Sequence, residues 1–422
     1  MTIIQQPTLF DIDFLEQLDI QEKYAQIFSP LEWEELLALF DKDTAVGAPV
    51  TINYEAVLRS ILARFYEQIP SQKKLIERLE EDLRFKLSMG FLYSEPVPSE
   101  ATYSRVMKRL SEHLELLENL NQELLQLIHQ DFGIFDENVA IDVTAVKART
   151  KQKKTENPKL PSTEEQRSMP TETILEQIPT YPSWGVKKNS QGKNNYWFGH
   201  KATLAVSSNS QYILHMHIAS AFAADVSLAI PTIRKVDALT KAARPVNDYL
   251  FDKGYDANAI YEELHHLGHE PIIALKKVPD NNGEVDAHFT PTCLLEYSYR
   301  YDSFDKRYGA LKFLRPEAHC RECPLQHEGL CQKVIKVKQM NDPRKYNHPA
   351  RGTLAWKQLY NQRSSVERVN GYLKSTYQLN QTKHYQAPQA IAEYLLIQLA
   401  YNAKTFANQR MKYTKKRKEA AA

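Results

Sequence analysis

The stretch that begins at Val139 constrains the fold more than any other feature of this sequence. Before it, apolar residues recur three or four positions apart, as Val57, Ile61 and Phe65 do, which is the period of amphipathic helices. From Val139 the run NVAIDVTAVKA is apolar and β-branched, a composition typical of a strand. Strand-like and helix-like segments alternate after it. We therefore predict an all-α N-terminal domain over residues 1–137, followed by an α/β core.

The core is itself divided by changes in composition. Polar residues with little periodicity fill 148–195, which predicts a flexible polar connection within the first part of the core. Two long helices are expected near the C-terminus, over about 354–376 and 386–409. The predicted parts after the N-terminal domain are the first part of the core at 138–279, an inserted Cys-containing subdomain at 280–340, a C-terminal helical part at 341–410 and a basic tail at 411–422.

The net charge of +2 hides an uneven distribution. The helical front is strongly acidic and the residues after 332 are strongly basic. This gradient is consistent with a half that faces a polyanion, although a basic tail that only aids solubility is equally consistent with it. We find no apolar run of membrane-spanning length and no secretory signal, so we expect a cytoplasmic protein without a membrane partner.

Three acidic residues stand out by their positions. Asp142 lies inside an otherwise apolar strand, where an unpaired carboxylate is costly. Asp252 directly follows the apolar run YLF, at a strand end, where open α/β sheets build their sites. Glu367 lies on a predicted helix beside Arg363. Carboxylates are the ligands that Mg²⁺ and Mn²⁺ prefer, so the three could hold metal ions, while an ordinary helix salt bridge between Arg363 and Glu367 remains the alternative.

The spacing around Glu367 carries a resemblance to a known family. Tyr360, Arg363, Glu367 and Lys374 match the Y-x₂-R-x₃-E-x₆-K signature of bacterial insertion-sequence transposases of the DDE class. AIDVTAV resembles the family's first catalytic strand and LFDKGYD its second aspartate segment. The front, from NYEAVLRSILARFYEQ onward, is similar to the helical N-terminal domain of these transposases, which implies a DNA-binding or dimerisation role for residues 1–137.

The resemblance implies a ribonuclease-H-like core in which Asp142, Asp252 and Glu367 bind two Mg²⁺ or Mn²⁺ ions. It implies DNA cleavage at the ends of a mobile element and joining of the 3′-hydroxyls to target DNA. The residues that it assigns to contacts with the DNA end are Tyr360, Arg363 and Lys374. The implied partners are double-stranded terminal inverted repeats and target DNA, bound by a homodimer in the bacterial cytoplasm at the nucleoid.

The cysteines form one group in the sequence. Cys320 and Cys323 are a close pair, Cys331 follows, and Cys293 could complete a tetrahedral zinc site, with His319 or His327 as substitutes. Clustered cysteines in a reducing compartment are more often metal ligands than disulfides. Buried free thiols are the alternative to a structural Zn²⁺.

Two other functions remain compatible with the sequence. One is a transposase-derived DNA-binding protein that no longer catalyses. The other is a metal-dependent nuclease without strand transfer, which would produce cut ends that are never joined to target DNA.

Overall fold

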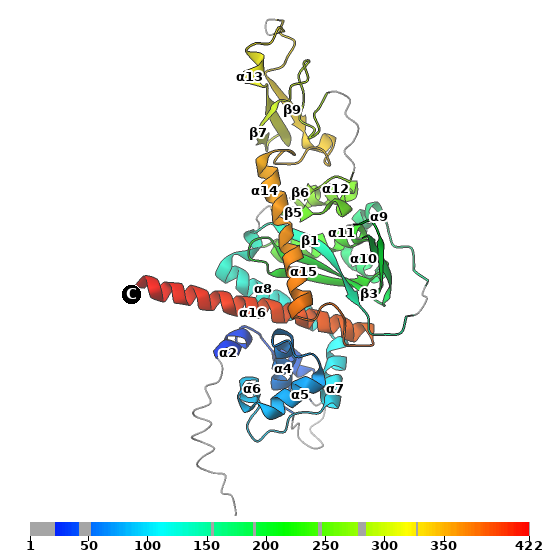
Figure 1. Cartoon of the computed structure of the whole chain (residues 1–422), viewed down its shortest axis with the longest axis vertical. Coiled ribbons are helices and arrows are strands. Elements are labelled where there is room, and N and C mark those ends of the chain that lie inside the picture. The colour runs from blue at the N-terminus through cyan, green and yellow to red at the C-terminus, as the bar shows by residue number, and fades with distance from the viewer. Residues whose placement is uncertain are drawn as a thin grey trace, which may run out of the picture. The chain divides into compact units, whose positions relative to one another are not determined.

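The computed structural model describes residues 22–41, 52–152, 156–188, 191–243, 247–276, 284–325 and 328–421, without side chains for 417–421. The chain forms two compact units (Figure 1). The first contains residues 1–132, 146–151 and 371–422, and the second contains 133–145 and 152–370. Of the predicted N-terminal domain, residues 1–21 and 42–51 lie outside the described residues.

The first unit is helical, as predicted for the front of the chain. Its helices begin at side chains that cap them: Asn53 accepts a hydrogen bond from the backbone of Ala56 at 3.1 Å, and Ser71 accepts one from Lys74 at 3.2 Å. The helices are α2 (Glu22–Phe28), α3 (Glu34–Ala38), α4 (Tyr54–Tyr66), α5 (Gln72–Glu81), α6 (Leu83–Ser88), α7 (Glu100–Ser111), α8 (Leu114–Phe132) and α16 (Ala387–Ala421).

Helix α16 is the centre of this unit. It packs against α8, α4, α7 and α2. Arg64 of α4 donates a hydrogen bond to Glu393 of α16 at 2.9 Å, and both side chains are buried. Glu393 also accepts hydrogen bonds from Thr382 and from the backbone of Lys383, each at 3.0 Å, so the buried ion pair is well satisfied. The helix continues to Ala421, beyond the end expected near residue 409, because Lys, Arg, Glu and Ala are good helix formers.

The second unit is built on a six-stranded sheet with the order β2-β3-β1-β5-β6, in which β4 also pairs with β3. Strand β1 begins at Val139, as predicted, and runs parallel to β5, which runs parallel to β6. The pairs β2–β3 and β3–β4 are antiparallel. The strands are β1 (Val139–Lys147), β2 (Ser183–Lys188), β3 (Asn194–Ser207), β4 (Ile213–Ser220), β5 (Asp248–Phe251) and β6 (Glu270–Ile273).

The segment 148–195 differs from the expected flexible connection. It contains helices α9 (Thr163–Ser168) and α10 (Thr171–Gln177) as well as strand β2. Ser162 and Glu165 form a reciprocal capping box at the start of α9, and Ile174 of α10 is fully buried. Helix α10 packs against α11 (Ala229–Thr240), and α9 packs against α12 (Asn258–Leu267). Contacts to distant segments, invisible to local periodicity, order this stretch.

The segment after β6 forms a small separate sheet. Strands β7 (Arg300–Asp305), β8 (Ala310–Leu314) and β9 (Val334–Lys338) are antiparallel, and the short helix α13 (Glu317–Cys320) lies between β8 and β9 in the chain. The small sheet has its own cluster of buried hydrophobic residues, Tyr299, Leu311, Phe313 and Ala350. The segment belongs to the second compact unit and does not form a compact unit of its own.

The predicted helix over 354–376 is two helices, α14 (Leu354–Gln362) and α15 (Ser364–Thr376), with Arg363 in helical backbone geometry between them. Helix α14 packs against β5 and β6. No helix in the described part of the chain is long and apolar enough to cross a membrane.

Candidate active site

The sheet register places two of the predicted acids at equivalent positions of neighbouring strands. Parallel strands β1 and β5 pair Val139 with Tyr249 and Ala140 with Leu250. Two residues beyond Ala140 lies Asp142, inside β1, and two residues beyond Leu250 lies Asp252, directly after the last residue of β5. Neighbouring strands are about 4.8 Å apart, so the two carboxylates leave the sheet side by side.

The electrostatics of Asp142 agree with this placement. The pKa of Asp142 is raised to about 6, chiefly by burial and also by the carboxylates of Asp252 and Asp225. A hydrogen bond from the backbone of Val143 and the charge of Lys187 act in the opposite direction. Asp142 thus lies in a half-buried position that is rich in negative charge, and a divalent cation would relieve that charge.

Asp252 is fixed by the turn that follows β5. Its Oδ1 accepts a hydrogen bond from the backbone of Gly254 at 2.6 Å, at the start of the 3₁₀ turn η3 (Lys253–Tyr255). A Cβ atom at position 254 would lie 2.7 Å from that same Oδ1. Glycine is therefore needed for this close approach, which explains the Asp-Lys-Gly-Tyr sequence.

Glu367 lies in the first turn of α15, where its half-exposed carboxylate is bonded to arginine. Arg363 Nη1 donates to Glu367 Oε1 at 2.8 Å. Burial alone would lower the pKa of Arg363, but the hydrogen bond to Glu367 and the charges of Glu367 and Asp142 raise it. The Arg363 guanidinium is therefore stabilised by the negative charges of both Glu367 and Asp142.

Tyr360 and Trp356 continue this arrangement along α14. Their rings stack with centroids 5.1 Å apart, and the Arg363 guanidinium lies 5.7 Å from the centre of the Tyr360 ring. Lys374 lies in the last turn of α15 and belongs to the first compact unit, so the structure does not place it against the carboxylates.

The structure therefore brings together Asp142, Asp252 and Arg363, with Glu367 bound to the arginine. In the described ranges, no three His, Cys, Asp or Glu side chains are grouped closely enough to hold a metal ion. The donor set nevertheless suits a hard divalent cation, because it consists of carboxylate oxygens inside β1, directly after β5 and on helix α15.

Gln362 is a positioning residue that sequence reasoning missed. Its Oε1 accepts hydrogen bonds from Asn138 Nδ2 and Ser208 Oγ, each at 3.0 Å. These bonds tie the junction of α14 and α15 to the start of β1 and to the residue after β3. Gln362 thus anchors the helix beside Arg363, and only its place next to the signature arginine could have drawn attention to it.

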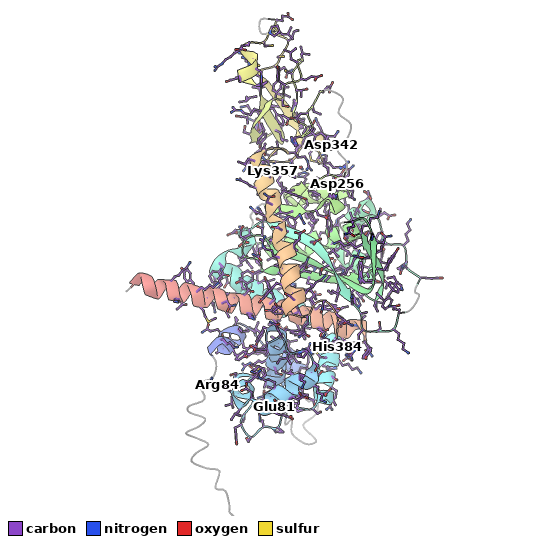
Figure 2. The ribbon with its side chains drawn as sticks, viewed as in Figure 1. Glu81, Arg84, Asp256, Asp342, Lys357 and His384 are labelled. Carbon is purple, nitrogen blue, oxygen red and sulfur yellow. The ribbon has the colours of Figure 1, made fainter. Side chains whose placement is uncertain are left out.

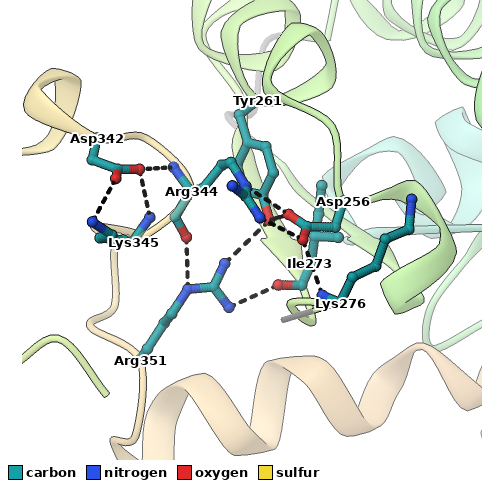
Figure 3. A network of polar contacts seen from close by, with 8 residues as sticks. All are labelled: Asp256, Tyr261, Ile273, Lys276, Asp342, Arg344, Lys345 and Arg351. Atoms are coloured by element: carbon teal, nitrogen blue, oxygen red, sulfur yellow. Dashed lines mark hydrogen bonds and ion pairs between the residues drawn. The ribbon is translucent and has the colours of Figure 1, made fainter. Parts of the chain in front are cut away.

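Asp256, the last residue of the Asp-Lys-Gly-Tyr-Asp segment that resembles the family motif, supports the turn through a polar network whose partners the sequence does not reveal (Figure 3). The carboxylate of Asp256 is fully buried and accepts hydrogen bonds from Arg344 Nε at 2.9 Å, Arg344 Nη2 at 2.7 Å and the backbone of Lys276 at 3.0 Å. Tyr261 adds a fourth bond at 3.2 Å. Arg351 then bonds the carbonyls of Arg344 and Ile273.

This network joins two segments of the second unit. Asp256 and Asp342 lie between the small sheet and the six-stranded sheet of this unit, where the chain returns from β9 (Figure 2). The bidentate bond from Arg344 fixes that return segment to the turn that follows Asp252. Asp256 is therefore a structural anchor of the turn that carries Asp252.

The four cysteines of the predicted zinc site line one cavity of about 300 Å³, and none of them is in a disulfide: Cys293, Cys320, Cys323 and Cys331. In the described ranges no three His, Cys, Asp or Glu side chains are grouped for a metal, so the structural Zn²⁺ stays a prediction. His319 instead stacks on Tyr297, with ring centroids 4.1 Å apart, and His327 lies outside the described residues.

Comparison with known proteins identifies the family. Residues 134–403 match the model of the transposase DDE domain, and residues 13–109 match a transposase domain, DUF772. The first match covers more than half of the chain, so the chain belongs to the DDE transposases. It is a DNA transposase, a metal-dependent enzyme that cleaves DNA and transfers strands.

Solved structures that resemble this chain are distant. The piggyBac transposase synaptic complex with hairpin DNA is 11% identical, covers 96% of this chain and 77% of its own, and gives a TM-score of 0.39. The Mos1 transposase paired-end complex with left transposon end is 16% identical, covers 55% and 61%, and gives a TM-score of 0.18. No curated protein sequence matches the chain. The assignment therefore rests on the family models.

Proposed function

We propose that Asp142, Asp252 and Glu367 hold two divalent ions in a ribonuclease-H-like core. The observation that carries the proposal is the register of the parallel strands β1 and β5, which brings Asp142 inside β1 level with Asp252 directly after β5. The strand order β4-β3-β1-β5-β6, with a parallel half and an antiparallel half, supports that core.

Two Mg²⁺ or Mn²⁺ ions would supply the activated water or 3′-hydroxyl and stabilise the leaving oxygen in an in-line displacement. The register of β1 and β5 positions Asp142, and the hydrogen bond from the backbone of Gly254 positions Asp252. Arg363 holds Glu367 until a DNA phosphate takes the guanidinium, because an arginine fork binds phosphate and carboxylate in the same way. Glu367 is then free to serve as a ligand.

The DNA end lies along α14 and α15 in this proposal. Tyr360 offers a ring and Arg363 a guanidinium next to the carboxylates, and Lys374 follows on the same helix as a phosphate contact. The substrates are the terminal inverted repeats of a bacterial insertion sequence and its target DNA, brought together by a homodimer.

A cleavage and joining assay tests this function. The full-length protein would be incubated with Mg²⁺, a supercoiled donor plasmid carrying the element's terminal repeats, and a target plasmid. We expect nicks at the repeat ends and joined products, both lost in Asp142→Ala and retained in Asp305→Ala, the same change at a partly exposed acid of β7.

Two outcomes contradict the proposal. If wild type and Asp142→Ala cut equally well, the Asp142 carboxylate takes no part in catalysis. The alternative function, a DNA-binding protein without catalysis, would then hold. Cut ends that never appear joined to the target plasmid would identify a nuclease without strand transfer.

A further inference from the structure

The end of strand β1 lies against the segment that leads into α16, far along the chain. The backbone N–H of Lys147 donates to the carbonyl of Asn380 at 3.0 Å, and the Lys147 carbonyl accepts from the backbone of Thr382 at 3.0 Å. Two residues further on, Arg149 Nη1 donates to the carbonyl of Lys383 at 3.0 Å. All of these residues belong to the first compact unit. Since these bonds use backbone groups of both lysines, they fix the two segments side by side without the lysine side chains.

Arg149 and Tyr385 form an exposed pair on these segments. The Arg149 guanidinium lies 4.8 Å from the centre of the Tyr385 ring, a cation–π contact, and the ring is 62% exposed. His384, the residue before Tyr385, marks the place in Figure 2. In the described part of the chain, the other N–H groups of Arg149 have no hydrogen-bond partner. The ring and the Lys383 carbonyl thus hold a planar fork of donors in place, which suits a phosphate.

The two segments carry basic residues without acidic neighbours in the chain. The sequence contains no Asp or Glu over 143–155 or over 368–392. The next acid, Glu393, is buried and bonded to Arg64. Four basic side chains of these segments form no ion pair with any described carboxylate: Lys147, Arg149, Lys151 and Lys383. Together with Tyr385, these four residues are called the basic patch below.

The basic patch lies on the chain segments that leave the candidate active site. Strand β1 carries Asp142 and ends at Lys147, whose side chain is exposed. The segment 377–386 directly follows α15, the helix that carries Glu367. Lys374, which the family signature assigns to the DNA end, lies in the last turn of α15 and in the same compact unit as the patch. The patch is therefore contiguous in the chain with both the carboxylates and an expected DNA contact.

We propose that the basic patch binds the phosphate backbone of double-stranded DNA next to the element's end, with Arg149 as a bidentate phosphate contact and Lys147 and Lys383 as flanking contacts. Tyr385 is a positioning residue that holds the Arg149 guanidinium ready for phosphate. The inference rests on the proposed function and adds a contact outside the signature around Glu367. DNA is favoured over the acidic helices of a second copy, because the chain is a DNA transposase and an arginine fork matches phosphate geometry.

The salt dependence of DNA binding tests the patch. The probe is a fluorescein-labelled, random-sequence duplex of about 30 base pairs, measured by anisotropy over a range of salt concentrations with Ca²⁺ in place of Mg²⁺. Arg149→Ala is expected to bind about fivefold more weakly and to reduce the slope of log Kd against log salt by about 1. Lys147→Ala/Lys383→Ala should reduce that slope by about 2 and leaves the bonds between the two segments intact, because these use backbone atoms of the lysines. Arg84→Ala, at an exposed arginine in the acidic part of the same unit, is the matched control and should change neither value.

Substitutions of the ring test the positioning role of Tyr385. Tyr385→Phe keeps an aromatic face beside Arg149 and should bind DNA as wild type does. Tyr385→Leu removes that face and should weaken binding about two- to fivefold, which is the size of an exposed cation–π contact. The salt slope should stay the same in Tyr385→Leu, because the Arg149 charge is still present. Equal affinities of the two variants would contradict the positioning role, and Tyr93→Leu, at another exposed tyrosine, is the control.

Photo-crosslinking gives a result that does not depend on how the substitutions affect folding. A benzophenone amino acid at position 385 is expected to crosslink to the labelled duplex, and one at position 93 is not. Unchanged Kd and salt slope in the arginine and lysine variants, or crosslinking at position 385 no stronger than at position 93, would overturn the inference.

Three outcomes separate this inference from its alternative and from the proposed function. If the patch variants bind DNA normally but change the mass of the free protein in light scattering, the patch binds a second copy and the inference is wrong. If the variants lose DNA affinity as expected but wild type cuts no donor plasmid, the patch assignment stands and the catalytic proposal fails. If wild type cuts and joins DNA and the patch variants bind and cut equally well, the proposed function stands and the patch assignment fails.

Discussion

Arg363 Nη1 donates a hydrogen bond to Glu367 Oε1 at 2.8 Å, so the helix acid of the candidate triad is held by the arginine of its own signature. The sequence alone left two interpretations of this pair, a helix salt bridge and a catalytic arrangement. The structure contains the salt bridge, and the position of Arg363 within reach of the Asp142 charge makes the two interpretations compatible.

Because Glu367 and Arg363 have different proposed roles, we expect substitutions of the two residues to have different effects on cleavage and DNA binding. Glu367→Gln should reduce Mg²⁺-dependent cleavage by at least about 100-fold and change DNA affinity little, because it removes a ligand and no phosphate contact. Arg363→Ala should weaken DNA binding as well as cleavage, since it removes a cation that the DNA would bind. Anisotropy and plasmid cleavage on both variants measure the split. Equal DNA affinity in the two variants would argue against the proposed role of Arg363.

Gly254→Ala should disturb Asp252. The added Cβ atom would lie 2.7 Å from Asp252 Oδ1, so the carboxylate must move away from its bond with the backbone of residue 254. Cleavage is expected to fall about tenfold or more, since small displacements of positioned groups cost this much. The matched control is Gly371→Ala in α15, where a Cβ atom meets nothing within 4 Å. A Gly254→Ala enzyme as active as the Gly371→Ala enzyme would show that Asp252 tolerates displacement.

Asp256→Asn should destabilise the second unit by about 2–4 kcal/mol, because it leaves Arg344 without its charged partner and weakens a buried network. The control is Asp305→Asn, which breaks an exposed pair with Lys336 at 3.0 Å and should cost less than about 1 kcal/mol. Urea unfolding of the two variants compares them. Equal midpoints would mean that the Asp256 network contributes no more than a surface ion pair.

Glu270 predicts a pH dependence of stability. Burial raises the pKa of Glu270 to about 7, against the hydrogen bond from Gln339 and a backbone bond from residue 348. A carboxyl group whose pKa is raised on folding destabilises the protein once pH exceeds its unfolded value, and fully above the folded value. Glu270→Gln should therefore be more stable than wild type at pH 8, by about 1–3 kcal/mol.

That difference should shrink as pH falls from 7 toward 5, because the wild-type carboxyl group is then protonated in the folded protein. Melting temperatures of both proteins across this range measure it. A difference that is constant with pH would contradict the raised pKa.

Local patterns were enough to predict part of this fold. The helical front, the strand at Val139 and the position of Asp252 directly after a strand all follow from periodicity and β-branched runs. The helices that begin at Thr163 and Thr171 were not predicted, since a polar stretch is ordered here by contacts with α11 and α12.

The residues that support the candidate site could not be predicted from local sequence patterns either. Gln362 bonds Asn138 and Ser208, and Arg344 bonds Asp256, across long stretches of chain. Such pairs leave no periodic pattern in a single sequence. The spacing of the cysteines did indicate that Cys293, Cys320, Cys323 and Cys331 gather around one space, since all four line the same cavity.

A change of metal preference tests the central claim most directly. Thiolate binds Mg²⁺ poorly and softer Mn²⁺ better, so replacing a ligating carboxylate by cysteine should change which ion supports cleavage. If Asp142 holds a catalytic ion, Asp142→Cys will lose plasmid cleavage in Mg²⁺ and recover part of it in Mn²⁺. An Asp142→Cys enzyme that cleaves as well as wild type in Mg²⁺ would contradict the account.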